Sequence, residues 1–410
     1  MTPETSPDKA EHVPPPPKVR RRHVFFIPGY DPNVPRRYRE LYRREGAKQA
    51  AISGYRIAVS GRPRDQNYQW AIEAEIDGAR THTTMEFLTW EDIVRRSMDR
   101  SILSSLFVLL RTAWIYLTSG ALIRLLRLRP QPMLAALYPL VIIAAQVTLA
   151  WIAARLTYWA LSDIADGWPG LCAGSAAFVA VIAGFRRIDR YIFAYYLIND
   201  YGFTARNRGR YPKPLRDRIT EFSARISEIC ATDVDEVLVI GHSTGAHLAV
   251  TAMANVAPRA GGAVLSLLTL GQVIPMVSFL PNAQELRSNL NALAQSTDIA
   301  WIDVSAPGDG GCFALADPVH VTGVAPPEPQ KHWPKVLSAA FSLSLSPEMA
   351  RRTKWKFFRR HIQYFCAFDR PRDYDYFQIT AGPLTLEDRF AWRGATASRT
   401  ETPLSGYRDF

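Results

Sequence analysis

Length, composition and charge already exclude several classes of protein. The chain has 410 residues, 48% hydrophobic and 21% charged, so it can bury a sizeable core and is neither disordered nor fibrous. Its four cysteines lie far apart, which argues against a disulfide scaffold and a zinc site and fits a reducing compartment. A net charge of +11 suits nucleic acid or an anionic membrane, and the positions of the arginines decide between them.

The first 22 residues predict a disordered polar tail. They contain four consecutive prolines and few apolar residues, and they lack the apolar segment of a secretory signal peptide. We therefore expect the N-terminus to stay in the cytoplasm. Four short apolar runs then predict strands, the last two of them joined in a hairpin by Asp77-Gly78: residues 24–27, 55–60, 70–76 and 79–88.

Two apolar runs without charges, residues 130–154 and 168–185, predict a membrane hairpin. Each can cross a hydrocarbon core of about 30 Å as a helix. Arginines lie mostly outside the pair, whereas Asp163 and Asp166 lie in the link between the runs. This distribution indicates that both ends of the hairpin face the cytoplasm. We expect transmembrane helices at about 132–156 and 168–185.

Residues 102–123 are also apolar, but Arg111 interrupts them near the middle. A charge at a bilayer centre costs about 2.5–3.5 kcal/mol on insertion scales. We therefore predict a helix that lies in the interface, or one that packs beside the hairpin while the Arg111 side chain extends to the interface. Parity supports this prediction, because two spans return the chain to its starting side and three would separate the parts before and after them. The whole membrane insertion is predicted to cover residues 100–188.

Beyond the insertion, strand-like and helix-like runs alternate. This pattern is typical of an α/β fold with a mostly parallel sheet flanked by helices. The expected strands are residues 236–240, 263–270 and 299–304, and the expected helices are residues 214–231, 246–256 and 284–294.

The most specific motif is GHSTG at residues 241–245, directly after the expected strand 236–240 and before an apolar helix. A nucleophilic serine must project from a tight strand-to-helix turn, where side chains two residues on either side would collide. The motif therefore predicts that Ser243 is a nucleophile. The alternative is an ordinary turn between a strand and a helix.

With GHSTG and FFIPGY at residues 25–30, the chain resembles the α/β-hydrolase superfamily, in particular its lipase- and esterase-like members. The resemblance covers residues 24–88 and 189–386. It implies an α/β-hydrolase-type sheet interrupted by a transmembrane helical hairpin. The expected organisation is a tail at 1–22, a hydrolase domain in two parts at 23–99 and 189–386, the insertion between them at 100–188, and a C-terminal tail at 387–410.

The superfamily order, serine then acid then histidine, implies that the catalytic acid lies after a later strand. Asp309 follows the expected strand 299–304 in a glycine-rich loop and is the favoured acid. Asp303, within that strand, and Asp317 are the alternatives.

The same order implies a base beyond the acid. His361 comes late in the chain in an apolar and aromatic segment and is favoured, with His320 and His332 as alternatives. A buried packing histidine is the competing interpretation of His361.

Two backbone N–H groups are expected to stabilise the oxyanion. Thr244, directly after the nucleophile, supplies one of them. Tyr30, in the loop after the first strand, is the favoured source of the other. This chemistry requires neither a metal ion nor an organic cofactor.

Basic residues crowd just before His361, where six of the ten residues 351–360 are lysine or arginine and aromatic residues lie among them. Such a segment can stack on single-stranded nucleic acid. Beside a membrane hairpin we expect it to contact anionic headgroups instead, with a solvated helix face as the alternative.

Together these observations predict a multi-pass protein of the cytoplasmic membrane, with a serine hydrolase domain that faces the cytoplasm. The expected partners are membrane lipids and a small-molecule or lipid ester, and no nucleic acid. A thioesterase or acyltransferase that uses the same serine is one alternative. An inactive, membrane-tethered binding or scaffold protein of the same fold is the other, and the sequence does not predict an oligomeric state.

Overall fold

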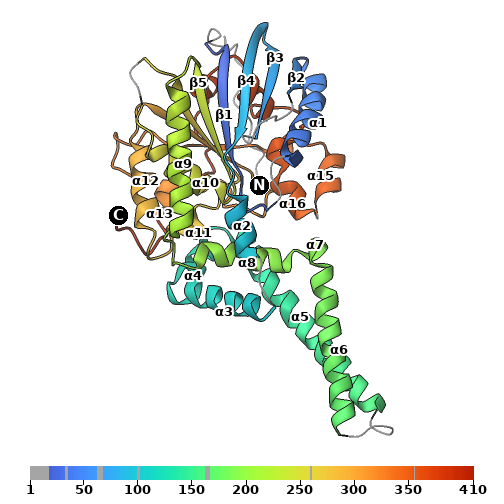
Figure 1. Cartoon of the computed structure of the whole chain (residues 1–410). Coiled ribbons are helices and arrows are strands. Elements are labelled where there is room, and N and C mark those ends of the chain that lie inside the picture. Colours follow the sequence, from blue (N-terminus) through green and yellow to red (C-terminus); the bar gives the residue numbers. More distant parts are fainter. Residues whose placement is uncertain are drawn as a thin grey trace.

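The computed structural model describes residues 18–32, 36–61, 68–98, 102–161, 167–258, 261–354 and 356–410. Within them an eight-stranded sheet runs in the order β2-β3-β4-β1-β5-β6-β7-β8 (Figure 1). Only β3 pairs antiparallel with its neighbours, β2 and β4. The predicted α/β class with a mostly parallel sheet is confirmed. The strands are β1 (Arg21–Ile27), β2 (Arg56–Ser60), β3 (Gln69–Ile76), β4 (Ala79–Phe87), β5 (Glu236–His242), β6 (Val264–Leu270), β7 (Ile299–Ser305) and β8 (Lys335–Ser338).

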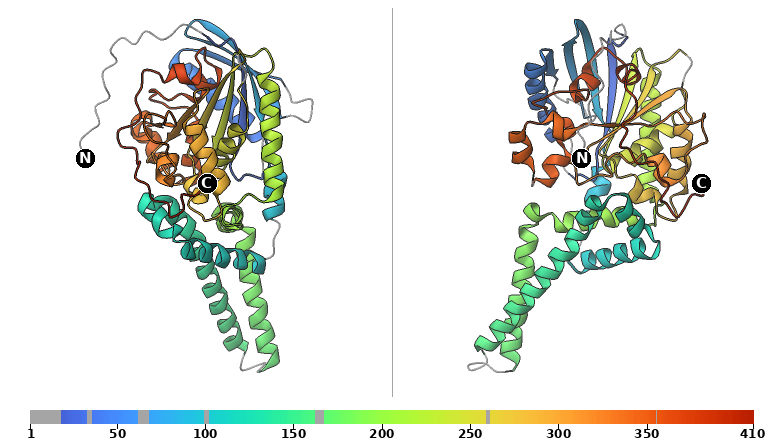
Figure 2. Two further views of the ribbon diagram at one scale, coloured as in Figure 1. Left: turned by 90° about the vertical axis from the view of Figure 1, so that its left-hand side faces the viewer. Right: turned by 180° about the vertical axis from the view of Figure 1, so that it is seen from behind.

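The central strands are buried on both faces because helices cover the sheet from each side (Figure 2). This explains why their sequences are continuous apolar runs rather than alternating ones. One apolar core lies between the sheet and α2 (Glu91–Met98), α9 (Lys213–Cys230), α10 (Gly245–Ala254), α11 (Pro275–Ser278), α12 (Gln284–Ala294) and α13 (Pro318–Thr322). The second core lies under α1 (Arg36–Ser53), α14 (Phe341–Ser344), α15 (Pro347–Thr353), the 3-10 turn η1 (Gln363–Phe365), α17 (Tyr376–Ala381) and α18 (Leu386–Arg389). The short helix α16 (Phe357–His361), which has no buried residue, precedes η1. We call the sheet and these helices the body.

A helical arm, formed by the part of the chain that follows α2 and precedes α9, projects from the body (Figure 1). Its long helices α5 and α6 are long and apolar enough to cross a membrane, with mean hydropathies of 2.0 and 1.6. A Cβ on Gly174 would lie 3.0 Å from the Ala154 carbonyl oxygen, so glycine lets the two helices approach closely. The arm consists of α3 (Ile102–Thr118), α4 (Ala121–Leu128), α5 (Pro130–Leu161), α6 (Trp168–Arg187), α7 (Asp189–Ile192) and α8 (Ala194–Ala205).

The single helix predicted at 102–123 is wrong. The chain breaks between α3 and α4, which are bent by 79°, and Gly120 at the break has a φ of 70°. Glycine adopts this left-handed conformation without a steric cost. Asp163 and Asp166, on which the predicted orientation of the hairpin partly depended, lie outside the described residues.

The predicted tails also need correction. Residues 1–17 lie outside the described residues, but β1 begins at Arg21, and the buried Arg22 side chain donates to Glu236 at 2.6 Å. At the other end of the chain, residues 387–410 pack on the body, where Arg287 donates to the Asp409 carbonyl oxygen at 2.7 Å. Polar contacts and buried apolar side chains together hold these segments, since Val19 and Phe390 are each 1% exposed.

Candidate active site

The GHSTG motif forms the turn between β5 and α10, which we call the serine turn (residues 241–245). Ser243 has a φ of 55°, a conformation that is costly for a residue with a Cβ. A Cβ on Gly245 would lie 2.5 Å from the Pro28 carbonyl oxygen, and one on Gly241 would lie 2.7 Å from the Ala249 Cβ. The two glycines therefore let the turn pack tightly while the serine projects from it.

The structure brings Asp309 and His361 together. Asp309 lies in the loop after β7 and is 2% exposed, and its Oδ2 lies 2.9 Å from His361 Nδ1. The Tyr364 hydroxyl donates to the same oxygen at 3.0 Å, and the Gly311 N–H donates to Oδ1 at 2.9 Å. The carboxylate is thus fixed by three donors rather than solvated in a turn.

This contact shifts the pKa of both groups. Burial by itself raises the pKa of Asp309, but the charge of His361 and the hydrogen bonds outweigh it and lower that pKa. Burial by itself lowers the pKa of His361, but the charge and hydrogen bond of Asp309 raise it above the ordinary imidazole value. Asp309 is therefore ionised at neutral pH and accepts the Nδ1 proton, which leaves Nε2 of a neutral His361 as a proton acceptor.

His361 lies beside the serine turn. Its ring centroid is 4.6 Å from that of His242, whose Nε2 lies 3.1 Å from the His361 carbonyl oxygen. Burial and the charge of His361 lower the pKa of His242 to about 3, so His242 stays neutral. Since β5 and β7 are parallel, Ser243 and Asp309 follow the same edge of the sheet, where ligands bind in open α/β sheets.

The loop after β1 packs against the same turn. A Cβ on Gly29 would lie 3.1 Å from the Ser243 Cβ. The neighbouring Tyr30 is buried, and its carbonyl oxygen accepts a hydrogen bond from the Tyr196 hydroxyl. Thr244 caps the start of α10, where backbone N–H groups have no acceptor within the helix. Both segments predicted to supply oxyanion donors therefore lie next to Ser243.

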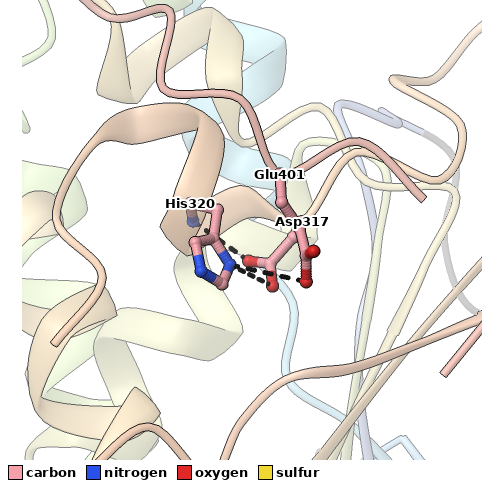
Figure 3. A group of neighbouring side chains, drawn as sticks. All are labelled: Asp317, His320 and Glu401. Atoms are coloured by element: carbon pink, nitrogen blue, oxygen red, sulfur yellow. Dashed lines mark hydrogen bonds and ion pairs between the residues drawn. The ribbon is translucent and has the colours of Figure 1, made fainter. Parts of the chain in front are cut away.

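Asp317 and His320 form a second pair, which lies beside Glu401 (Figure 3). Asp317 caps α13, and its Oδ2 lies 2.9 Å from His320 Nδ1 and 3.1 Å from Lys331 Nζ. Asp317, His320 and Glu401 lie close enough to hold a cation, but Lys331 and Arg399, which pairs with Glu401 at 2.6 Å, already supply positive charge. The group is an ion-pair network that holds the C-terminal segment.

The remaining alternatives lie elsewhere. Asp303 lies within β7, where its Oδ1 accepts from the Thr269 hydroxyl at 2.5 Å, and burial raises its pKa to about 8. An acid that is neutral at pH 7 cannot stabilise an imidazolium as a triad carboxylate does. His332 is exposed on a loop, and its backbone N–H donates to the Ala294 carbonyl oxygen.

The structure adds Asp200, which the sequence did not indicate. This half-buried residue of α8 accepts a hydrogen bond from the Thr244 hydroxyl at 3.4 Å. Burial raises its pKa to about 7, against the hydrogen bond from Thr244 and the charge of His361. A helical acid in a segment without a recognisable motif gives no sequence signal, so only the packing of the arm on the body reveals it.

Comparison with known proteins adds nothing to this geometry. No family model, curated protein or solved structure matches the chain. Its function must therefore be inferred from the chemistry of its own residues.

Proposed function

We propose that the chain is a membrane-anchored serine hydrolase of the α/β-hydrolase type that cleaves carboxylic esters of lipids or other apolar acyl compounds. The main support is the Asp309–His361 pair beside the serine turn, where Oδ2 lies 2.9 Å from Nδ1 and Ser243 has a φ of 55°. A buried carboxylate, an oriented imidazole and a serine on a strained turn are the three parts that nucleophilic acyl transfer requires.

In this mechanism, the Ser243 hydroxyl oxygen attacks the acyl carbonyl carbon while Nε2 of His361 accepts its proton. Asp309 holds the imidazole in the required tautomer and stabilises the imidazolium. Backbone N–H groups of Thr244 and Tyr30 stabilise the oxyanion. His361 then protonates the leaving alcohol, and a water molecule deprotonated by His361 hydrolyses the acyl-enzyme.

The arm supports the membrane part of the proposal. Two helices of sufficient length and hydropathy form a hairpin, and basic residues Arg186 and Arg187 close its second helix at the body end. Basic residues at that end favour a body on the cytoplasmic side of a cytoplasmic membrane. A catalytic domain held at a bilayer has lipid esters as its nearest apolar acyl substrates.

Ester turnover by the purified full-length chain tests the proposal. We expect hydrolysis of p-nitrophenyl esters, with Ser243→Ala reducing kcat by at least about a thousandfold and the exposed Ser398→Ala having no effect. Full activity of Ser243→Ala would contradict the proposal. Turnover of thioesters alone would favour the thioesterase alternative, acyl transfer to an added alcohol would favour the acyltransferase, and a folded chain without activity would favour the scaffold.

A further inference from the structure

Helix α3 carries a row of large apolar side chains that the protein leaves uncovered. Phe107, Leu110, Trp114 and Leu117 are 64%, 66%, 68% and 57% exposed. Their spacing of three and four residues places them on one side of the helix. The opposite side packs on the rest of the arm through Leu109 and on the body through the Tyr116 hydroxyl, which donates to the Met276 carbonyl oxygen at 2.9 Å. The exposed row, which we call the α3 face, therefore points away from the body.

The α3 face lies beside the end of the α5–α6 hairpin that is nearest the body. Leu109 of α3 shares an apolar cluster with Ile143 of α5 and Tyr195 of α8. The guanidinium of Arg186, near the end of α6, lies 5.4 Å from the centroid of the same Tyr195 ring. Arginines at the end of a span mark the interface between hydrocarbon and headgroups. Since α3 runs across the hairpin rather than along it (Figures 1 and 2), it lies where that interface would be.

We propose that α3 lies in the plane of the membrane with the α3 face embedded in the leaflet nearest the body, and that the active site takes its acyl substrate from this leaflet. The first part depends only on the hairpin being a membrane anchor. The second part rests on the proposed hydrolase function. A helix with one apolar side and a polar flank is the usual form of such an interfacial element.

Continuity with the hairpin favours a lipid leaflet over a second copy of the chain as the occupant. A bilayer that surrounds α5 and α6 reaches the α3 face without any additional partner. A basic residue beside the α3 face also favours a lipid leaflet. Arg111 is exposed there, and its guanidinium donates to the Arg206 carbonyl oxygen at 3.1 Å. Exposed basic residues at the end of α15 and in the segment between α15 and α16 can contact anionic headgroups: Arg351, Arg352, Lys354 and Lys356.

The basic segment contributes less charge than its sequence suggests. Arg360 donates to the carbonyl oxygens of Gly308 and Ala350, and Arg359 donates to the Gln363 side chain at 3.1 Å. These two arginines hold the segment that carries His361. Trp355 lies outside the described residues.

Helix α8 connects the α3 face to the active site. Gly202 of α8 packs against Val108 and Thr112 of α3 so closely that a Cβ would collide with Val108. On the body side, α8 and the residue before it touch each of the three catalytic segments. Tyr196 bonds the Tyr30 carbonyl oxygen, Asp200 bonds Thr244, and the Phe193 ring lies 4.3 Å from that of Phe358, three residues before His361. Helix α8 therefore lies between α3 and the site.

Depth measurements with single spin labels test the first part. In full-length chains with the exposed Cys172 replaced by serine, Leu110→Cys or Trp114→Cys is labelled and reconstituted into vesicles of phosphatidylcholine and phosphatidylglycerol. Val179→Cys on α6 is the embedded control and Ala224→Cys on α9 is the aqueous control, since all four sites are exposed on the protein. We expect the α3 labels to resemble Val179, with high accessibility to oxygen and low accessibility to a water-soluble nickel complex. Labels as accessible to nickel as Ala224, or shielded from both reagents by a second copy, would overturn the proposal.

Substrate supply tests the second part. Leu110→Asp places a charge in the α3 face, and Thr220→Asp on the exposed surface of α9 is its matched control. We expect Leu110→Asp to lower the ratio of turnover of a vesicle-embedded long-chain ester to turnover of a soluble short-chain ester by about tenfold or more, and Thr220→Asp to leave it unchanged. An unchanged ratio for Leu110→Asp would overturn supply from the leaflet. A chain without any esterase activity would contradict the proposed function, whereas the depth measurement would still decide the position of α3.

Discussion

At the scale of single residues, the Asp309–His361 pair determines the pH at which His361 can act as the base in the proposed mechanism. Because Asp309 raises the pKa of His361, kcat/KM should rise with pH as the imidazolium loses its proton at a pH above the ordinary histidine value. Asp309→Asn removes the charge, so we expect this acidic limb to move to lower pH and the rate to fall by roughly 10⁴. The pH profile of kcat/KM for both chains measures this.

Asp303→Asn is the matched control for that experiment. Asp303 lies six residues before Asp309 but inside β7, and its pKa of about 8 makes it neutral at pH 7. An amide can accept the same hydrogen bond from Thr269, so this variant should keep the acidic limb in place. A limb that moves with Asp303→Asn and not with Asp309→Asn would contradict the assignment of the acid.

A buried ion pair gives a prediction on stability. Arg22 and Glu236 are fully buried, 2.6 Å apart, and join β1 to β5. Arg22→Met leaves Glu236 as an uncompensated buried charge, so we expect the free energy of unfolding to fall by about 3–5 kcal/mol. Denaturant unfolding in detergent measures it, with the exposed Arg20→Met as the control. An Arg22→Met chain as stable as the wild type would contradict the proposed importance of the pair.

The sequence indicated one candidate for the serine but left alternatives for the acid and the base. GHSTG indicated Ser243 as the candidate nucleophile, because the steric demands on a nucleophilic serine are local and leave a motif. It could not distinguish Asp309–His361 from Asp317–His320, because each is a hydrogen-bonded aspartate–histidine pair and only the tertiary fold places one of them beside the serine turn.

At the scale of elements, the serine turn depends on its close approach to the loop after β1. A Cβ on Gly245 would lie 2.5 Å from the Pro28 carbonyl oxygen. Gly245→Ala must therefore separate α10 from that loop, and we expect a stability loss of about 1–3 kcal/mol together with loss of esterase activity. Gly394→Ala is the control, because nothing lies within 4 Å of its added Cβ. Activity measured beside the melting temperature checks this, and an active Gly245→Ala chain would contradict the tight packing.

Helices and strands could be predicted where apolar residues form a continuous run or recur with a regular period. The central strands and α9, α12, α5 and α6 follow from continuous or periodic apolar runs. Helix α1 was missed because arginines dominate it and its buried side includes Gly46 and Gln49. Strand β8 has only four residues, too few for a pattern. Packing against α8 and α5, rather than local sequence, stabilises α3 beside its break from α4.

At the scale of the whole molecule, the sheet fixes the topology. Strand β1 precedes the arm and pairs along its length with β5, which follows it, so a membrane crossed by α5 and α6 would have both parts on the same side. We expect Ile52→Cys on α1 and Ala224→Cys on α9, in a chain with Cys172→Ser, to react with an impermeant maleimide only from the cytoplasmic side. Labelling of the two sites from opposite sides would require a third span and contradict the hairpin.

The most direct test of the central claim is labelling of Ser243 by a fluorophosphonate, which reacts with activated serines. Membranes that carry the wild-type chain or Ser398→Ala should be labelled, His361→Gln should react far more slowly, and Ser243→Ala should not react. A folded wild-type chain that resists the probe, or a Ser243→Ala chain that is labelled as fast as the wild type, would contradict the assignment of Ser243 as the nucleophile.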